Sequence, residues 1–556
     1  MNRSPIALAM IAVAGVGHAQ IHPQRYVYEA VVSDSAIASQ VGADILAKGG
    51  TAVDAAVAVG FALAVTHPAA GNIGGGGFMI VRRRSGETVA LDFREVAPLA
   101  ATKDMYIGAD GKVTKDSLVG YRAAGVPGTV AGLAEAHRRY GKLRWQELVE
   151  PAVRLAYRGF KLPRGLAESL RESAEMFRPF PAAYAQFCRN GNFYTTGDTF
   201  RQPALGKTLE RIRDHGAKDF YEGETAQLIV KDMAAKGGHI TTADLKDYRV
   251  VARTPLVGKY RGYEVITMPP PSLGGIALLQ MLGIVEGDDL GKLGWNSSAT
   301  LHLTVEAMKR AFADRAEHLG DSDFVSVPVA QLLAPDYISR LRKRITDRAL
   351  PAKEVKPWGK ESEQTTHYSI IDIDGNAVST TYTLNGSYGA GAVVEGAGFL
   401  LNNEMDDFSA QPGTPNLFGL IQGEKNSIQA GKRPLSSMTP TILVKDGKVA
   451  MVLGSPGGPT IINTVFQTIM NVVDHGMNIQ RAVAAPRFHH QWMPDAIRWE
   501  PYGLGDDLRK VMEAKGHVFE TQARTMGSCH AIWTTGQGNR QVGVDPRIST
   551  SGAAGL

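Results

Sequence analysis

Hydrophobic periodicity near the start of the chain predicts two helices followed by two strands. The segment 33–50 (SDSAIASQVGADILAKGG) carries candidate cap residues at its first three positions and ends at a glycine pair. The segment 51–68 (TAVDAAVAVGFALAVTHP) begins with the Thr51-x-x-Asp54 spacing of a capping box. It is apolar almost all round, which predicts a buried helix. Residues 70–95 then give a glycine cluster, a strand, a turn and a second strand.

The rest of the chain changes from helical to strand-like periodicity at about residue 365. Helical patterns occupy 128–141, 145–159 and 298–320, and a proline-rich turn at 267–275 precedes another helix. Runs of β-branched and aromatic residues follow at 367–373, 377–384 and 441–454, with helices predicted at 459–475 and 507–516. Strands therefore flank a helical middle at both ends of the sequence. This order predicts a layered α/β sandwich in which the first and last parts of the chain share one core.

Two adjacent threonines, Thr365 and Thr366, stand where the strand-like region begins. The preceding stretch, 349–363, is rich in charges and contains two prolines and a glycine, which is typical of an exposed loop or linker. The following strand turns back at Asp374-Gly375, a strong hairpin signal. The threonines thus mark the entry of a loop into a sheet. Taken alone, they are better explained by the strand propensity of threonine than by a functional role.

Composition indicates an ordinary globular protein that is too long for a single typical domain. The 556 residues are 44% hydrophobic and 21% charged, with a formal net charge of +5. This charge is small for the length, and no basic stripe with interleaved aromatic residues is present. These features argue against a nucleic-acid partner.

The N-terminus has the pattern of a secretory signal peptide. Arg3 precedes an apolar run at 6–16, and small residues occupy the −3 and −1 positions before Gln20. We therefore expect cleavage after Ala19 and export to a periplasm or to the medium. A membrane anchor is the alternative, but the apolar run is too short to span a bilayer. No stable membrane anchor is expected.

Several possible sites give weak signals. The glycines at 74–77 lack the Gly-Lys-Ser/Thr ending of a phosphate loop and precede a strand, so close backbone packing explains them better. His489 and His490 are adjacent and would point to opposite faces of a strand, and no cluster has zinc-like spacing, so no metal is expected. The two cysteines, Cys188 and Cys529, could pair in an oxidising compartment, but nothing in the sequence brings them together.

Three polar motifs in the second half are stronger candidates. The turn GSPGGP (454–459) lies between a predicted strand and a predicted helix, an arrangement that can aim backbone N–H groups at an anion; a simple tight turn is the alternative. The segment KRPLSSMTPT (432–441) holds two serines but no Gly-x-Ser-x-Gly elbow, so a serine-hydrolase triad is unsupported. The segment NNEMDDF (402–408) clusters acidic residues, which could bind a cation or form a solvated turn.

Taken together, these motifs resemble one family. The chain resembles the γ-glutamyltranspeptidases (glutathione hydrolases) in the sequence and the order of its motifs. In the second half these motifs are EQTTHYSIID, TYTLN, LLNNEMDDFS, KRPLSSMTPT and GSPGGPT, and in the first half they are AGNIGGGGFM, LDFRE, GVPGTVAGL and MPPPSLGG. The resemblance covers nearly the whole chain after the signal peptide. It implies the four-layer αββα sandwich of the N-terminal-nucleophile hydrolases.

The resemblance also implies self-cleavage at Gln364–Thr365. A precursor would give a large subunit (20–364) and a small catalytic subunit (365–556) that remain together as a heterodimer. Thr365 would become the nucleophile, with its own new α-amine as the base. Thr366 would support it rather than react.

Other residues receive roles through the same resemblance. Thr383 would support the Thr365 hydroxyl, and the N–H groups of Gly457 and Gly458 would form the oxyanion hole. The substrate α-carboxylate would bind Arg94, Ser436 and Ser437, since arginine forms a two-pronged contact with a carboxylate. The substrate α-ammonium would bind Asn385, Glu404 and Asp407. A purely structural salt bridge is the alternative role for Arg94.

The implied reaction is transfer of a γ-glutamyl group from glutathione or a related compound to water, an amino acid or a dipeptide, without a cofactor or metal. The segment 412–423 corresponds to a lid loop in some members, with Phe418 where bacterial relatives often carry tyrosine. One rival is a glutaryl-type cephalosporin acylase of the same superfamily, against which the acidic cluster argues. Another is a periplasmic amino-acid-binding protein without chemistry, which would have no need of the Gln364–Thr365 junction.

Overall fold

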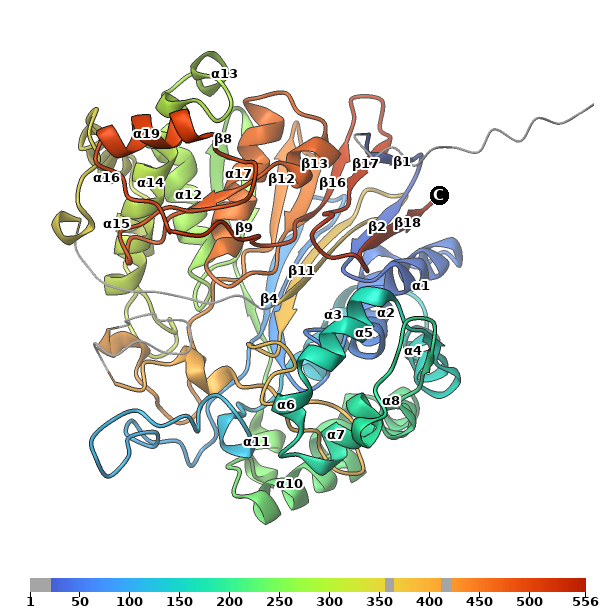
Figure 1. Cartoon of the computed structure of the whole chain (residues 1–556). Helices are drawn as coiled ribbons and strands as arrows, with labels where there is room; N and C mark the ends of the chain where they lie inside the picture. The colour runs from blue at the N-terminus through green and yellow to red at the C-terminus, as the bar shows by residue number, and fades with distance from the viewer. Residues whose placement is uncertain (1–21, 356–364, 412–422) are drawn as a thin grey trace, which may run out of the picture.

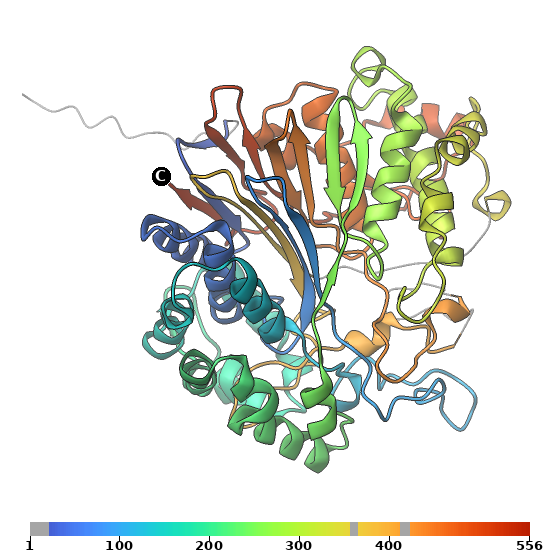
Figure 2. The same cartoon turned by 180° about the vertical axis from the view of Figure 1, so that it is seen from behind.

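The structure of the protein is a computed structural model that describes residues 22–355, 365–411 and 423–556. The predicted signal peptide, Gln364 and Phe418 lie outside these residues. Figure 1 shows a sandwich of two sheets between two layers of helices, and Figure 2 shows it from behind.

Each of the two large sheets in the described part has seven antiparallel strands. The first sheet has the order β18 (Gly552–Gly555), β2 (Ala30–Ser33), β10 (Thr366–Ile371), β11 (Ala377–Thr383), β3 (Gly76–Arg82), β4 (Thr88–Phe93) and β7 (Val251–Arg253). The second has the order β1 (Gln24–Tyr26), β17 (Arg540–Gly543), β16 (His530–Thr534), β13 (Lys448–Gly454), β12 (Thr441–Lys445), β9 (Tyr263–Thr267) and β8 (Leu256–Tyr260). Two small sheets pair β5 (Phe160–Lys161) with β6 (Thr199–Phe200), and β14 (Phe488–His489) with β15 (Arg498–Trp499). Both large sheets combine strands from the two ends of the sequence, as predicted.

The helices form one layer on each outer face. The layer over the first sheet contains α1 (Ala36–Ala47), α2 (Ala52–Thr66), α3 (Thr129–Tyr140), α4 (Trp145–Arg158), α5 (Arg164–Glu172), α6 (Ala174–Phe177), α7 (Pro181–Cys188), α8 (Pro203–His215), α9 (Ala217–Glu222), α10 (Glu224–Lys236) and α11 (Thr242–Asp247). The layer over the second contains α12 (Gly274–Val285), α13 (Leu290–Leu293), α14 (Ser298–His318), α15 (Val329–Leu332), α16 (Pro335–Lys343), α17 (Thr460–Val473), α18 (Ile479–Ala484) and α19 (Asp506–Ala514).

Side chains that alternate between the two faces of each strand build three apolar cores, one between each sheet and its helices and one between the sheets. On β10, Ile370 packs toward the helices of the first layer, whereas its neighbour Ile371 packs between the sheets. The inter-sheet core also receives Val452 and Ile532 from the second sheet. Successive residues of a strand point to opposite faces, so a strand buried on both sides is apolar on both. The αββα architecture is therefore confirmed.

Local signals set the boundaries of the elements near the site. Thr51 and Asp54 form the predicted capping box of α2, and every residue of that helix is buried. Ser35 is the cap of α1 and accepts a hydrogen bond from the Ala38 N–H. The β10–β11 hairpin turns at Gly375, whose φ of 85° lies in the left-handed region that favours glycine.

Glycines at the start of β3 allow the neighbouring strand to approach closely. A Cβ on Gly75 would lie 2.0 Å from the Thr383 carbonyl oxygen, and one on Gly77 would lie 2.5 Å from that of Thr381. No side chain fits at such distances, which confirms the packing interpretation of this cluster and excludes a phosphate loop. The glycines thereby fix β11, and with it Thr383, beside the head of β10.

Candidate active site

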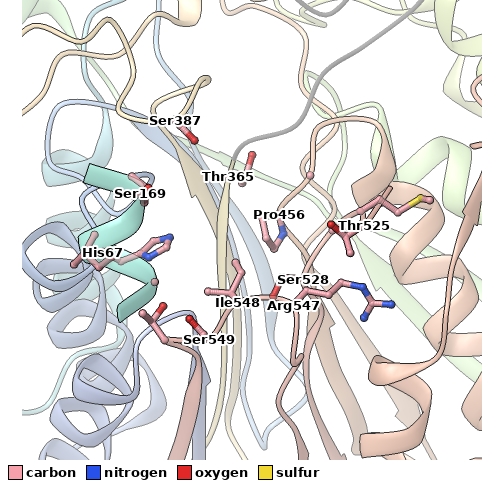
Figure 3. A pocket seen from close by; sticks show the side chains of 17 residues that line it. His67, Ser169, Thr365, Ser387, Pro456, Thr525, Ser528, Arg547, Ile548 and Ser549 are labelled. Carbon is pink, nitrogen blue, oxygen red and sulfur yellow. The ribbon is translucent and has the colours of Figure 1, made fainter. Parts of the chain in front are cut away.

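The predicted nucleophile lies at the entry of β10, beside a cavity of about 380 Å³ (Figure 3). The Thr365 hydroxyl is 3.5 Å from the Thr383 hydroxyl on β11. The Asn385 N–H donates to Thr383 Oγ1 at 2.8 Å. A hydroxyl oxygen can accept two hydrogen bonds, so Thr383 Oγ1 can accept the proton of the Thr365 hydroxyl as well as the Asn385 N–H. The geometry therefore suits the supporting role predicted for Thr383.

Residues from both sides of the predicted cut line this cavity. His67, which caps the C-terminal end of α2, and Ser169 of α5 come from the part before residue 364. Ser387, Gly457 and Arg547 come from the part after it. Figure 3 shows the His67 ring directed into the cavity, opposite the Arg547 side chain. Cleavage would thus leave a site shared between two chains.

The turn between β13 and α17 contains the two glycines predicted to bind an oxyanion. Gly457 has a φ of 126° and Gly458 a φ of 53°, both in the left-handed region where glycine is favoured. Within the described residues, neither amide N–H donates a hydrogen bond. Gly457 lines the same cavity as Thr365. The turn therefore offers unpaired backbone donors beside the candidate nucleophile, as an oxyanion hole requires.

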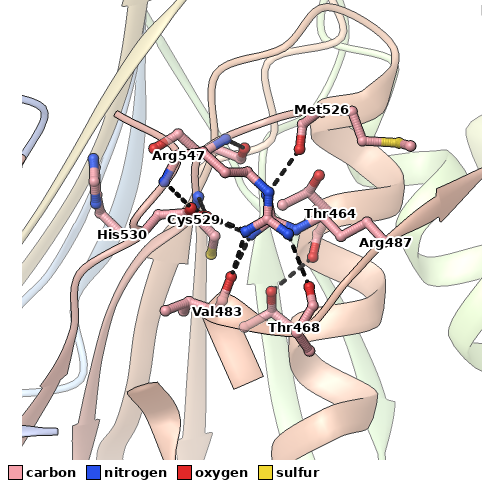
Figure 4. A network of polar contacts seen from close by, with 12 residues as sticks. Thr464, Thr468, Val483, Arg487, Met526, Cys529, His530 and Arg547 are labelled. Carbon is pink, nitrogen blue, oxygen red and sulfur yellow. Dashed lines mark hydrogen bonds and ion pairs between the residues drawn. The ribbon is translucent and has the colours of Figure 1, made fainter. Parts of the chain in front are cut away.

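A buried arginine holds the loop that supports this turn (Figure 4). Arg487 donates to the Met526 carbonyl at 2.8 Å and also pairs with Asp545, which accepts the Cys529 N–H at 2.7 Å. The loop between Met526 and Cys529 packs against the glycine turn, since a Cβ on Gly457 would lie 3.1 Å from the Gly527 Cα. Buried charged groups that are fully paired fix such a loop in one position.

The residues predicted to hold the substrate form one buried cluster around Arg94. Its guanidinium makes ion pairs with both Glu404 and Asp407 and donates to the Leu435 carbonyl at 2.9 Å. A third carboxylate, Glu95, lies 3.4 Å from Arg94 Nη1. Glu404 and Asp407 belong to a buried 3-10 helix rather than a solvated turn. Asp406 in the same helix instead accepts from the Ser117 hydroxyl at 2.7 Å.

This cluster carries more acidic than basic groups. Burial raises the pKa of Glu404 well above its usual value, although Arg94 opposes the shift. Burial likewise raises the pKa of Asp407, and it raises the pKa of Glu95 to about 7. Three buried carboxylates thus surround the Arg94 guanidinium, and the charge of Arg315 also favours the ionised form of Asp407. A ligand that brings an ammonium group would relieve this imbalance.

The two predicted serines follow on the same chain segment as Leu435. The Ser436 hydroxyl accepts the Met438 N–H at 3.2 Å, and the Ser437 hydroxyl accepts from Arg315 at 3.1 Å. Asn385 joins the cluster through its amide, which donates to the Asn403 carbonyl at 3.0 Å, next to Glu404. The structure thus brings the predicted substrate residues together, but as one joined cluster rather than two separate clamps.

The weaker candidates do not form sites. Cys188 and Cys529 are both buried and unpaired. His489 contacts the Asn463 amide and His490 lies 3.3 Å from Asp495, so the two rings have different partners. No group of His, Cys, Asp or Glu in the described ranges could hold a metal ion. Within those ranges no helix is both long and apolar enough to cross a bilayer.

The segment before the predicted cleavage junction is more ordered than its composition suggests. The composition of 349–363 predicted an exposed loop, but Ala352 is fully buried. Its N–H donates to Asp495 at 2.7 Å and its carbonyl accepts from Trp492 at 2.8 Å. The prediction holds for Pro351, Lys353 and Glu354, which are exposed, but not for Ala352 and Val355, which are buried. Residues 356–364 lie outside the described part.

Sequence reasoning missed several polar residues at the site. The sequence marks Asp34 only as a candidate helix cap, but the residue is fully buried and contacts Thr366 and His530. Arg315 and His67 lie within helices or at their ends and belong to no recognised motif. The one signal in the sequence was that Asp34 stands next to Ser35, which is the actual cap of α1, so that Asp34 is left without a capping role. No local sequence pattern indicates that Asp34 lies near the predicted nucleophile.

Two stacked antiparallel sheets between helical layers, with a threonine entering a central strand beside unpaired backbone donors, define an N-terminal-nucleophile hydrolase. The structure of cephalosporin acylase from Bacillus halodurans is similar, with a TM-score of 0.86, 26% identity and 99% of each chain covered. The γ-glutamyltranspeptidase of Helicobacter pylori is 45% identical over 64% of this chain and 97% of its own, with a TM-score of 0.57.

Sequence comparison specifies the family. A model of the gamma-glutamyltranspeptidase family matches residues 38–555. The glutathione hydrolase proenzyme of Escherichia coli K12 is 48% identical over 96% of this chain and 93% of its own. That of Pseudomonas aeruginosa PAO1 is 47% identical over 93% of each. The chain therefore belongs to the γ-glutamyltranspeptidase family and is an enzyme of that family.

Proposed function

We propose that the chain cleaves itself at Gln364–Thr365 and then acts as a glutathione hydrolase and γ-glutamyltransferase. Thr365 attacks the γ-amide carbonyl of glutathione or a related γ-glutamyl compound. A γ-glutamyl ester forms on Thr365 and the amine leaves. Water, an amino acid or a dipeptide then accepts the γ-glutamyl group. No cofactor takes part in these steps.

Cleavage creates the base that the reaction needs. In the intact chain the Thr365 nitrogen is an amide, which cannot accept a proton. A free α-amine has a pKa of about 7.7–8.0, so a useful neutral fraction exists at neutral pH. It belongs to the same residue as the hydroxyl and needs no separate positioning. The N–H groups of Gly457 and Gly458 would then stabilise the oxyanion.

The observation that carries the choice of substrate is the cluster of Arg94 with Glu404 and Asp407. A γ-glutamyl group ends in an α-carboxylate and an α-ammonium. When it enters, its carboxylate replaces an acidic side chain on Arg94, with Ser436 and Ser437 alongside. Its ammonium binds the released carboxylates together with Asn385. The substrate thereby exchanges into an existing buried ion pair: its carboxylate replaces a side-chain carboxylate on Arg94, and its ammonium pairs with the carboxylate that is displaced.

The two products of cleavage are proposed to remain together as a large subunit (20–364) and a small subunit (365–556). Strands of both parts alternate in the first sheet, where β10 of the small subunit pairs with β2 of the large one. The solved Helicobacter pylori chain matches 64% of this sequence, consistent with a relative that consists of separate chains. Separation would expose the shared cores, so the heterodimer should persist.

A panel of donors tests this function and distinguishes it from glutaryl acylase activity. The panel is γ-glutamyl, glutaryl and α-glutamyl anilides, measured with the wild type and with Asp407→Asn. Because glutaryl lacks the ammonium, Asp407→Asn should lower kcat/KM for γ-glutamyl donors by about 30- to 3,000-fold and that for glutaryl donors far less.

Asp406→Asn is the matched control, because Asp406 lies on the same short helix but contacts Ser117. It should leave the donor preference unchanged. Equal losses on both donors in Asp407→Asn would show that Asp407 serves folding. A wild type that prefers glutaryl donors would overturn the proposed substrate in favour of acylase activity. One relative carries that activity in its name, the Acylase ACY 1 proenzyme, which is 37% identical over 90% of this chain.

Export is the remaining part of the proposal. The pattern at 1–19 is that of a signal peptide, so the mature large subunit should begin Gln20-Ile21-His22. N-terminal sequencing of protein collected from the periplasm or medium checks this expectation. Protein that retains Met1 and stays inside the cell would contradict it.

A further inference from the structure

A buried carboxylate of the predicted large subunit lies directly behind the predicted nucleophile. Asp34 follows the last residue of β2 and is completely shielded from solvent. Its Oδ2 accepts a hydrogen bond of 2.5 Å from the hydroxyl of Thr366, the residue after Thr365. Its Oδ1 accepts one of 2.7 Å from His530 Nε2. Asp34 is thus fixed between Thr366 and His530, the first residues of β10 and β16.

The strand register explains why a side chain is needed at this point. β10 pairs with β2 only from Tyr368, opposite Ser33, to Ile371. The first residue of β10, Thr366, is paired on its other side with Tyr382 of β11. It therefore extends beyond the end of β2. The carboxylate of Asp34 reaches across this gap and supplies the contact that the backbone ladder does not.

The C-terminal segment closes the same position. The Thr550 hydroxyl donates to the Asp34 carbonyl oxygen at 2.7 Å, just before β18 pairs with β2. The hydroxyls of Ser528 and Ser551 lie 3.5 Å from Asp34 Oδ1. Burial alone would raise the pKa of Asp34, but the contacts with His530 and Thr366 outweigh burial and lower it to about 2. The group is thus a carboxylate throughout the physiological range.

We propose that Asp34 is a positioning residue that holds the newly formed N-terminus of the small subunit through the Thr366 hydroxyl. The inference rests on the proposed role of Thr365 as an N-terminal nucleophile. Before cleavage, the chain constrains Thr365 from both sides. After cleavage, Thr365 is a chain end, and chain ends are poorly ordered unless they are held. A charge-assisted hydrogen bond one residue away provides that hold.

The proposal predicts different effects on cleavage and on turnover. Thr366→Val removes the hydroxyl but keeps the shape, and Asp34→Asn removes the charge. Both variants should still cleave into two fragments, yet kcat should fall by about 10- to 100-fold with KM within about threefold, because a nucleophile misplaced by about 1 Å costs about that factor. Thr366→Ser keeps the hydroxyl and should restore kcat to within about threefold of the wild type.

Thr380→Val is the matched control. Thr380 is equally buried on the neighbouring strand β11, and its hydroxyl has no hydrogen-bond partner in the described part of the chain. This substitution should leave kcat unchanged. In the double variant Asp34→Asn/Thr366→Val, the losses should be far from additive, since Asp34→Asn weakens the same contact that Thr366→Val removes.

Gel analysis of the fragments and kinetics with a γ-glutamyl anilide measure these effects on one preparation. Normal kcat in Thr366→Val and Asp34→Asn would overturn the proposal, as would a Thr366→Ser variant as impaired as Thr366→Val. A wild type that is not cleaved before Thr365 would instead overturn the proposed function. If Asp34→Asn fails to fold, the Thr366 series still decides the matter.

Discussion

Thr365→Ala should remain a single chain and lose at least about 10⁴-fold in activity toward γ-glutamyl donors, because both cleavage and turnover need the Thr365 hydroxyl. The wild type should run as two fragments, and the smaller one should begin Thr-Thr-His-Tyr-Ser. Gel electrophoresis, N-terminal sequencing and anilide kinetics check these three results together.

Thr365→Ser is the control for this experiment. It keeps the hydroxyl and should still cleave, but more slowly, because the β-methyl that restricts χ1 is gone. A small fragment that begins at any other residue would remove Thr365 from the role of nucleophile. A Thr365→Ala variant that cleaves and turns over normally would do the same.

Arg94→Leu should mature into two fragments but turn over γ-glutamyl donors poorly. Self-cleavage acts on the Gln364 carbonyl and needs no substrate carboxylate, whereas recognition of the donor does. Loss of one partner of a desolvated charge pair costs about 2–5 kcal/mol, which lowers kcat/KM by about one and a half to three and a half decades. Fragment bands and kcat/KM should be measured on the same preparation.

The structure adds a second variant to this test. Arg94 lies among three carboxylates, so Arg94→Leu also leaves buried acidic groups without a cation and should reduce stability. Arg94→Lys keeps the charge but loses the two-pronged geometry, and it should fold well while kcat/KM still falls by about tenfold or more.

Arg261→Leu breaks a different ion pair, with Asp474 at 2.8 Å, and should lower stability without lowering kcat/KM. If Arg94→Lys is stable and has the kcat/KM of the wild type, Arg94 has no part in the site. If both Arg94 variants are unfolded or uncleaved, Arg94 is a structural salt bridge.

Much of the fold could be predicted because its signals are local. The Thr51–Asp54 capping box, the strand alternation after residue 365 and the turn at Asp374-Gly375 each depend on residues a few positions apart. Local signals also misled. The charged, proline-containing stretch at 349–355 looks like a free loop, yet Ala352 is fixed by Asp495 and Trp492, more than a hundred residues away.

The candidate site could be predicted residue by residue only through the resemblance to a family. The roles of Thr365, Gly457, Gly458 and Arg94 in catalysis and binding stay predictions, although the structure places Thr365 and Gly457 at one cavity and Arg94 in a single cluster with Glu404 and Asp407. The direct ion pairs of Arg94 with Glu404 and Asp407 could not be predicted, because no sequence pattern shows which charged side chains pair with one another when the substrate is absent.

The sequence by itself determined the layered α/β class of the fold, the approximate bounds of its main helices and strands, and the entry of the chain into a strand at Thr365 and Thr366. Hydrogen bonding and side-chain periodicity within a few residues are sufficient for these features. Only the tertiary structure decided that Asp34 lies behind Thr366, and that His530 meets it from a distant strand. Those contacts join residues separated by several hundred positions, and they form only because stacking the two sheets brings the ends of β2, β10 and β16 to one point.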